Sequence, residues 1–147
     1  MKDKIRILFL CTGNSCRSQM AEAWANHLLA DKVEAFTAGL IAHGLDPMAV
    51  RAMAEVGIDI SGNRSKSWDE FLPEHWDYVI PLCNTAYETC PFFPGAGKIV
   101  HHGFDDPPTL ARDERDEDKA MNHYRRVRDE IKAFVEKLPQ DLENRDE

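Results

Sequence analysis

The first thirty residues constrain the fold most, because an apolar run, a polar loop and a helical repeat follow one another directly. Residues 5–10 form an apolar run of strand length, which suits a strand buried on both faces. Residues 11–18 are polar and contain a glycine, which predicts a loop. Residues 19–30 then place apolar side chains along one helical stripe. The segment therefore predicts a strand, a loop and a helix.

The same alternation continues along the chain. Further strands are expected at residues 33–38, 77–82 and 98–102, and helices at residues 48–56, 68–72 and 121–138. The last helix is expected to stop at Pro139, ahead of a polar, frayed tail. Strands that alternate with helices predict an α/β fold with three layers, in which helices cover both faces of a four-stranded parallel sheet. One domain over residues 1–147 is expected.

Composition narrows the function classes. A formal net charge of −8 argues against nucleic-acid binding, which needs clustered basic residues. No apolar run approaches the roughly 20 residues needed to cross a bilayer, and residues 5–10 are too short for a secretory signal. We therefore expect a cytoplasmic protein without a membrane partner. Four cysteines in that compartment indicate catalytic, redox or metal-binding groups more than structural disulfides.

The loop at residues 11–18 has the composition of an oxyanion cradle. Cys11 and Arg17 stand six positions apart between the predicted strand and helix. A tight loop that enters a helix N-terminus points backbone N–H groups inward, where they bind a tetrahedral anion. Arg17 adds a planar cation that matches two oxygens, and the positive field favours the nucleophilic thiolate of Cys11. Ser18 is placed to donate a hydrogen bond to that thiolate.

The anion site is expected to use the whole loop, namely Thr12, Gly13, Asn14, Ser15, Cys16, Arg17 and Ser18. Packing is the favoured role of Cys16, because a second cysteine in the loop need not face the anion. A buried cysteine and an arginine at this spacing by chance are the alternative interpretation. The flanking strand and helix and the internal glycine favour the cradle.

A second cysteine pair, Cys83 and Cys90, follows the third predicted strand. A metal site would need shorter spacing and more ligands. If residues 83–90 were helical, the two cysteines would be about 10 Å apart, whereas a disulfide needs Cα atoms roughly 4.4–6.8 Å apart. We therefore expect that oxidation loops this segment out and exposes a Cys83–Cys90 bond. Two unrelated buried thiols are the alternative.

Two carboxylates, Asp105 and Asp106, precede a pair of prolines. A carboxylic acid near the cradle would protonate a departing oxygen. The alternative interpretation is a solvated turn in which the two aspartates have no catalytic role. The residues alone do not choose between Asp105 and Asp106. Cys11, Cys83 and the two aspartates each follow a predicted strand, so they are expected to converge at the carboxyl edge of the sheet.

On these residues the sequence resembles the thioredoxin-coupled arsenate reductases, which are built on the low-molecular-weight tyrosine phosphatase fold. The resemblance covers essentially the whole chain, from the motif CTGNSCRSQMAE that begins at Cys11, through Ser61, Cys83 and Cys90-Pro91, to the motif GFDDP that begins at Gly103.

The resemblance implies a mechanism. Cys11 attacks arsenate held by the loop amides and Arg17, and Asp106 protonates the leaving hydroxide. Cys83 then attacks Cys11 and releases arsenite, Cys90 attacks Cys83, and thioredoxin reduces the resulting Cys83–Cys90 bond. Phosphate and sulfate are expected to compete with arsenate, and no cofactor is expected.

One position departs from the family pattern. Some members hold a potassium ion beside the loop through an acidic side chain, where this sequence has Lys66. Asn14 and Glu22 match other ligand positions, and Thr37 supplies a similar hydroxyl. A lysine ammonium would repel a cation and replace it by pairing with Glu22. The sequence therefore predicts potassium-independent activity and no metal site.

Two rival functions share parts of this pattern. A tyrosine phosphatase needs the cradle and the acid but no relay, and phosphatases of this fold tend to carry aromatic residues where Pro108 and Thr109 stand here. A non-catalytic oxyanion or redox sensor would bind and change conformation without turnover. A sensor would have no use for a general acid at Asp106, which disfavours this function.

Overall fold

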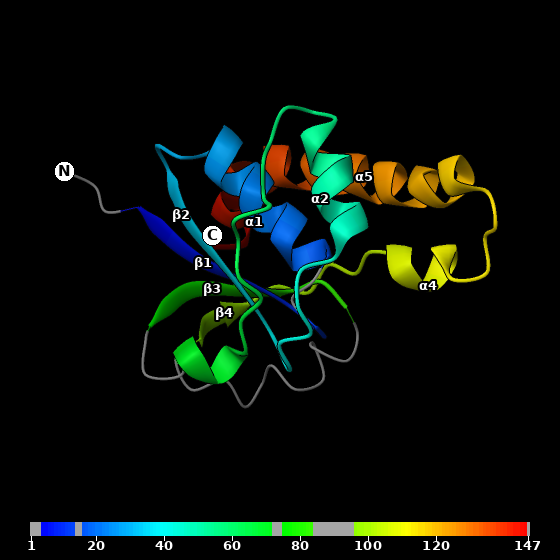
Figure 1. Cartoon of the computed structure of the whole chain (residues 1–147). Helices are drawn as coiled ribbons and strands as arrows, with labels where there is room; N and C mark the ends of the chain where they lie inside the picture. The colour runs from blue at the N-terminus through cyan, green and yellow to red at the C-terminus, as the bar shows by residue number, and fades with distance from the viewer. Residues whose placement is uncertain (1–3, 14–15, 72–74, 84–95, 147) are drawn as a thin grey trace.

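The computed structural model describes residues 4–13, 16–71, 75–83 and 96–146 (Figure 1). Four parallel strands form one sheet in the order β2-β1-β3-β4. They are β1 (Ile5–Cys11), β2 (Val33–Gly39), β3 (Trp76–Pro81) and β4 (Ala96–Ile99). The helices are α1 (Arg17–Leu28), α2 (Pro47–Ala54), α4 (Pro107–Ala111) and α5 (Glu117–Asp146), with a 3-10 helix η1 (Trp68–Phe71). The predicted α/β fold with a four-stranded parallel sheet is confirmed.

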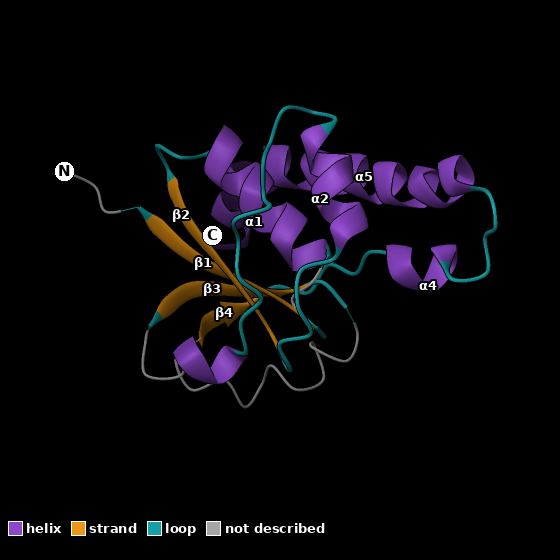
Figure 2. Ribbon diagram, in the orientation of Figure 1, coloured by secondary structure: helices purple, strands orange, loops and turns teal. Residues whose placement is uncertain are grey.

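The sheet is covered unequally on its two faces. Helices α1, α2 and α5 lie together on one face, and η1 lies on the other (Figure 2). Strand β1 is buried on both sides, as predicted, because Ile7 and Phe9 join the core beneath the helices while Leu8 and Leu10 join a smaller cluster that Trp68 of η1 covers. Each of these four β1 side chains is fully buried, which contributes about 1.5–3 kcal/mol apiece. This central strand fixes the position of the loop that follows it.

Most predicted elements lie within two residues of the observed ones, but the end of the last helix was predicted wrongly. Helix α5 continues past Pro139 to Asp146. Proline inside a helix costs about 3 kcal/mol, because it removes one N–H donor and its ring crowds the carbonyl four residues earlier. Buried Val135 and Leu138 anchor the helix on the core just before that position, so the chain remains helical.

The short helix α4 was absent from the sequence prediction. Asp106 is its N-cap residue and Pro107 occupies the first turn. Proline is favoured there because the first helical N–H groups have no intrahelical partner. The two prolines thus begin a helix, which the sequence analysis did not expect at this position. Among the described helices, none combines the length and apolar composition that crossing a membrane requires.

Helix α2 is joined to α5 by an ion-pair network centred on Glu55. Arg125 donates to its carboxylate at 2.8 Å, and Arg128 donates at 3.1 Å. Arg128, which is 8% exposed, also donates to the carbonyl oxygen of Ala52 at 2.9 Å. The hydrogen bond from Arg125 is the main cause that lowers the pKa of Glu55 from 4.5 to about 2.

This network predicts a loss of stability in acid. A carboxyl whose pKa is lower in the folded state stabilises the fold above its unfolded pKa, and that contribution disappears as the pH falls from 4.5 to about 2. Because the Glu55 side chain is 34% exposed, we expect only about 1 kcal/mol after solvent screening. Urea unfolding of wild type and Glu55→Gln should show that difference at pH 6 and none near pH 2. A constant difference across this range would contradict the assignment.

Candidate active site

The loop between β1 and α1 is held from outside by the segment that follows β2. The carbonyl oxygens of Cys11, Thr12 and Gly13 accept hydrogen bonds from the N–H groups of Leu40, Ile41 and His43, at 3.2, 3.1 and 3.0 Å. In a trans peptide the N–H group points opposite to the carbonyl, so the N–H groups of Thr12 and Gly13 point away from this segment. That arrangement leaves them available to an anion. Asn14 and Ser15 lie outside the described residues.

Glycine at position 13 lets the loop pack closely against the His43 side chain. A Cβ atom there would come within 3.1 Å of His43 Cγ, and the Gly13 carbonyl also accepts a hydrogen bond from Ser65 at 3.1 Å. His43 was not among the residues that the sequence suggested. No local motif singled it out, because its contact with the loop depends on the parallel pairing of β1 and β2.

Cys11 and Ser18 are in direct contact, as predicted. The Sγ atom of Cys11 lies 2.9 Å from Oγ of Ser18, and both side chains are buried. When Cys11 is a thiolate, the serine hydroxyl is the donor, and a charge-assisted hydrogen bond stabilises the anionic sulfur. The geometry therefore equips Cys11 to act as a nucleophile.

Cys83 lies at the edge of the same loop. The backbone N–H of Leu82 donates to the Leu10 carbonyl at 2.8 Å, which extends the β1–β3 pairing to the ends of both strands. Cys83 Sγ is thereby placed 3.3 Å from Oγ1 of Thr12, and Cys11 and Cys83 belong to one buried cluster. The predicted convergence of these two cysteines at the carboxyl edge of the sheet is confirmed. Cys90 lies outside the described residues.

Arg17 links the loop to the segment that carries the two aspartates. Its Nη1 atom donates to the Phe104 carbonyl at 3.0 Å, and its Nη2 atom lies 3.5 Å from the Asp106 carboxylate. Asp106 also accepts a hydrogen bond from Thr109 at 2.7 Å. The neighbouring Asp105 pairs with Arg126 at 3.0 Å and lines a separate pocket with Arg17 and Cys83. Asp106 is the aspartate that lines the same cavity as Cys11.

A cavity of about 350 Å³ opens above the nucleophile. It is lined by Cys11, Thr12, Gly13, Cys16, Arg17, His43, Asp106, Pro108 and Arg112. The cavity contains a thiol, a cation and an acid within one small polar space, which suits a tetrahedral oxyanion. Arg112, like His43, was missed from the sequence, because the charge run at residues 112–119 indicates only a solvated loop or the first turn of a helix.

Cys16 fits the packing role that the sequence favoured. It is 2% exposed and belongs to the core beneath the helices. Burial raises the pKa of its thiol well above the ordinary value, and the negative charge of Asp46 adds to the effect. Asp46 is held by the Tyr124 hydroxyl at 2.6 Å and the Met48 N–H at 2.9 Å. Cys16 therefore remains a neutral thiol beside Cys11.

Lys66 acts electrostatically on Glu22, in line with the substitution seen in the sequence. Burial raises the pKa of Glu22, and the charge of Lys66 opposes that rise. The Lys66 ammonium also donates to the Arg64 carbonyl at 3.0 Å.

We expect the activity to be independent of potassium. The value of kcat/KM for arsenate should differ by less than about twofold between potassium chloride and sodium chloride at equal ionic strength. Lys66→Asp is the matched variant and should gain a response to potassium; a several-fold potassium activation of the wild type would contradict the prediction.

The parallel sheet, the cysteine in a strand-to-helix loop and the facing acid define a class of enzyme in which a thiolate attacks a bound oxyanion. The chain belongs to the low molecular weight phosphotyrosine protein phosphatase family, whose model matches residues 6–147. This confirms the family that the sequence resembles.

Within that family the chain is similar to arsenate reductases. It is 50% identical over 140 residues to the arsenate reductase of Bacillus subtilis (strain 168), covering 92% of this chain and 98% of the relative. It is 45% identical over 134 residues to arsenate reductase 2 of Staphylococcus epidermidis, covering 91% and 95%.

Solved structures of arsenate reductases and of a tyrosine phosphatase share the fold of this chain. An arsenate reductase in its phosphate-binding state is 33% identical with a TM-score of 0.71, covering 91% of this chain and 95% of that one. A low molecular weight protein tyrosine phosphatase from T. tengcongensis is 28% identical with a TM-score of 0.74, covering 94% and 99%.

Proposed function

We propose that this chain reduces arsenate to arsenite through a relay of Cys11, Cys83 and Cys90, with thioredoxin as the electron donor. The observation that carries the proposal is the 3.3 Å contact between Cys83 Sγ and Thr12 Oγ1. Phosphoryl transfer through Cys11 needs no second thiol beside the nucleophile loop, whereas a disulfide relay does. The 45–50% identity to proteins named arsenate reductase supports the same function.

The first step is nucleophilic attack. The Cys11 thiolate attacks arsenic(V) held by the loop N–H groups and Arg17, and a thiolate–arsenic bond forms. Asp106 donates a proton to the departing hydroxide, which leaves as water. Ser18, 2.9 Å from Cys11, stabilises the thiolate before the attack.

The second step transfers the electrons. The Cys83 thiolate attacks Cys11 Sγ, the sulfur–arsenic bond breaks, and its electron pair goes to arsenic, which leaves as arsenite. A Cys11–Cys83 disulfide remains. Cys90 then attacks Cys83, which frees Cys11 as a thiolate and leaves a Cys83–Cys90 disulfide. A dithiol of the thioredoxin class reduces that bond and is itself oxidised, so one cycle moves two electrons to one arsenate.

Steady-state turnover tests the proposal. Arsenate-dependent NADPH oxidation with thioredoxin and its reductase should proceed in wild type and be lost in Cys11→Ser, Cys83→Ser and Cys90→Ser. Hydrogen exchange across residues 83–90 should also differ between reduced and oxidised protein, because the relay needs this segment to loop out. Arsenate turnover by Cys83→Ser at the wild-type rate would refute the relay.

The assignment of the acid gives a separate prediction. Asp106→Asn should lower kcat for arsenate by about 10²–10³-fold, because general acid catalysis is lost. Asp105→Asn is the matched control and should change kcat by less than about threefold, because Asp105 pairs with Arg126 at the surface and does not line the cavity that holds Cys11 and Asp106. Equal losses in both variants would show that the loop, and no single carboxylate, is responsible.

Hydrolysis of aryl phosphates is the second candidate activity. The family match and the fold shared with a tyrosine phosphatase favour it, and phosphate has the shape and charge of arsenate. Cys11, Arg17 and Asp106 supply the groups that this reaction uses, so slow hydrolysis is expected beside arsenate reduction. If the chain hydrolysed an aryl phosphate and never turned over arsenate, the phosphatase alone would be the function.

A further inference from the structure

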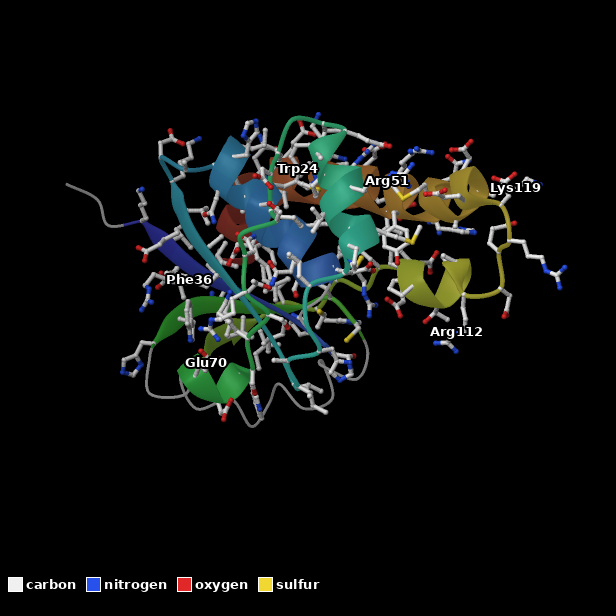
Figure 3. All side chains as sticks on the ribbon, viewed as in Figure 1. Trp24, Phe36, Arg51, Glu70, Arg112 and Lys119 are labelled. Atoms are coloured by element: carbon white, nitrogen blue, oxygen red, sulfur yellow. The ribbon has the colours of Figure 1, made fainter. Side chains whose placement is uncertain are left out.

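The cavity above Cys11 has a second arginine among its lining residues, Arg112 at the end of α4. Its side chain extends from α4 on the side away from α5 (Figure 3). Arg112 shares the wall with Arg17, Asp106 and Pro108. No step of the proposed relay uses Arg112.

The two arginines that line the cavity differ in the hydrogen bonds and ion pairs that they make with the rest of the protein. Arg17 donates to the Phe104 carbonyl and lies 3.5 Å from Asp106, and its side chain is 11% exposed. Arg112 is exposed, and within the part of the chain that the structure describes its guanidinium makes no hydrogen bond or ion pair with another side chain. Its donors therefore remain available to a molecule in the cavity.

The position of Arg112 is set by the helix that also carries the acid. Asp106 is the N-cap residue of α4, and Arg112 is the C-cap residue with helical backbone angles (φ −53°, ψ −43°). Six residues at ~1.5 Å each separate them by about 9 Å along the helix. One short helix thus presents a carboxylate at one end and a cation at the other.

The two cations would meet different parts of a bound anion. When the loop N–H groups and Arg17 hold three oxygens of a tetrahedral anion, the fourth substituent points out toward the mouth of the cavity. In free arsenate or phosphate this substituent is an oxygen that accepts hydrogen bonds and carries charge. In a phosphate monoester it is an ester oxygen that bears a carbon group. A guanidinium at the mouth favours the first and gains little from the second.

We propose that Arg112 binds the outward oxygen of a free inorganic oxyanion and so makes the site selective for such anions over phosphate monoesters. This inference deepens the proposed arsenate reduction and rests on it for the reaction, but not for the binding. A local cation also offsets a net charge of −8, which would otherwise slow the approach of a dianion. Among the described residues that line the cavity, none is phenylalanine, tyrosine or tryptophan, so the His43 ring is the aromatic surface that this part of the wall offers an aryl group.

Arg112→Gln tests the proposal, and Arg115→Gln is the matched control, because Arg115 is exposed in the same segment but does not line the cavity. For Arg112→Gln we expect KM for arsenate to rise about five- to tenfold. KM for an aryl phosphate should change by less than about twofold. Arg115→Gln should leave both KM values unchanged. Parallel changes for both substrates, or a KM for arsenate equal to that of the control, would overturn the proposal.

Binding of inorganic phosphate to the reduced protein separates this proposal from the proposed function. Calorimetry should show weaker phosphate binding by Arg112→Gln than by Arg115→Gln. If the wild type failed to turn over arsenate and this difference were present, the proposed reaction would fail and the role of Arg112 would stand. Equal phosphate affinity in the two variants would refute the role of Arg112 whatever the reaction.

Discussion

Cys11→Ser protein is expected to lose both arsenate reduction and aryl phosphate hydrolysis, by at least about 10⁴-fold. A serine hydroxyl is a far weaker nucleophile than a thiolate, and the contact at this position is another hydroxyl, Ser18 at 2.9 Å, which cannot act as a base. Both reactions begin with attack by the same sulfur, so both should fall together.

The matched measurement for Cys11→Ser is phosphate binding. The loop carbonyls of Cys11, Thr12 and Gly13 are held by residues 40–43 through the backbone, so the cradle should survive the substitution. Calorimetry should therefore show phosphate bound with an affinity within about threefold of wild type. Residual arsenate turnover above one part in about a hundred would mean that another group begins the reaction.

Cys83→Ser is expected to separate the two activities. Arsenate turnover should fall by more than about 10³-fold, because no sulfur remains to displace arsenite from Cys11. Aryl phosphate hydrolysis should stay within about threefold of wild type, since serine can keep the hydrogen bond to Thr12 Oγ1 that Cys83 makes at 3.3 Å. Both activities are measured on the same preparation.

Cys83→Ser would contradict the relay if the two activities did not separate. A parallel loss of both activities would make Cys83 a support for the loop through Thr12, and it would remove the second thiol from the relay. Thermal unfolding of the variant guards against a folding defect, because Cys83 is 8% exposed and contributes to a buried cluster.

The nucleophile loop and its sheet were predictable because their signals are local. The apolar run of β1 and the spacing of Cys11 and Arg17 lie within a dozen residues, and the edge where Cys83 and Asp106 meet follows from the rule for parallel strands. The contact between Ser18 and Cys11 was likewise expected from the turn of a loop into a helix.

Other parts depend on tertiary packing that local patterns do not encode. The continuation of α5 past Pro139 depends on the anchoring of Val135 and Leu138 in the core. His43 enters the site through the pairing of β1 with β2, and Arg112 through the short helix α4. The residues alone left Asp105 and Asp106 open, and the family resemblance favoured Asp106; the ion pair between Asp105 and Arg126 on α5 was visible only in the structure.

The most direct test of the relay is the disulfide formed in a single turnover. Reduced Cys90→Ser protein is mixed with one equivalent of arsenate, and its peptides are analysed by mass spectrometry without reduction. One arsenite should be released per protein, and a Cys11–Cys83 disulfide should accumulate because nothing resolves it. Arsenite released without that disulfide, or a Cys11–Cys16 disulfide in its place, would refute the relay.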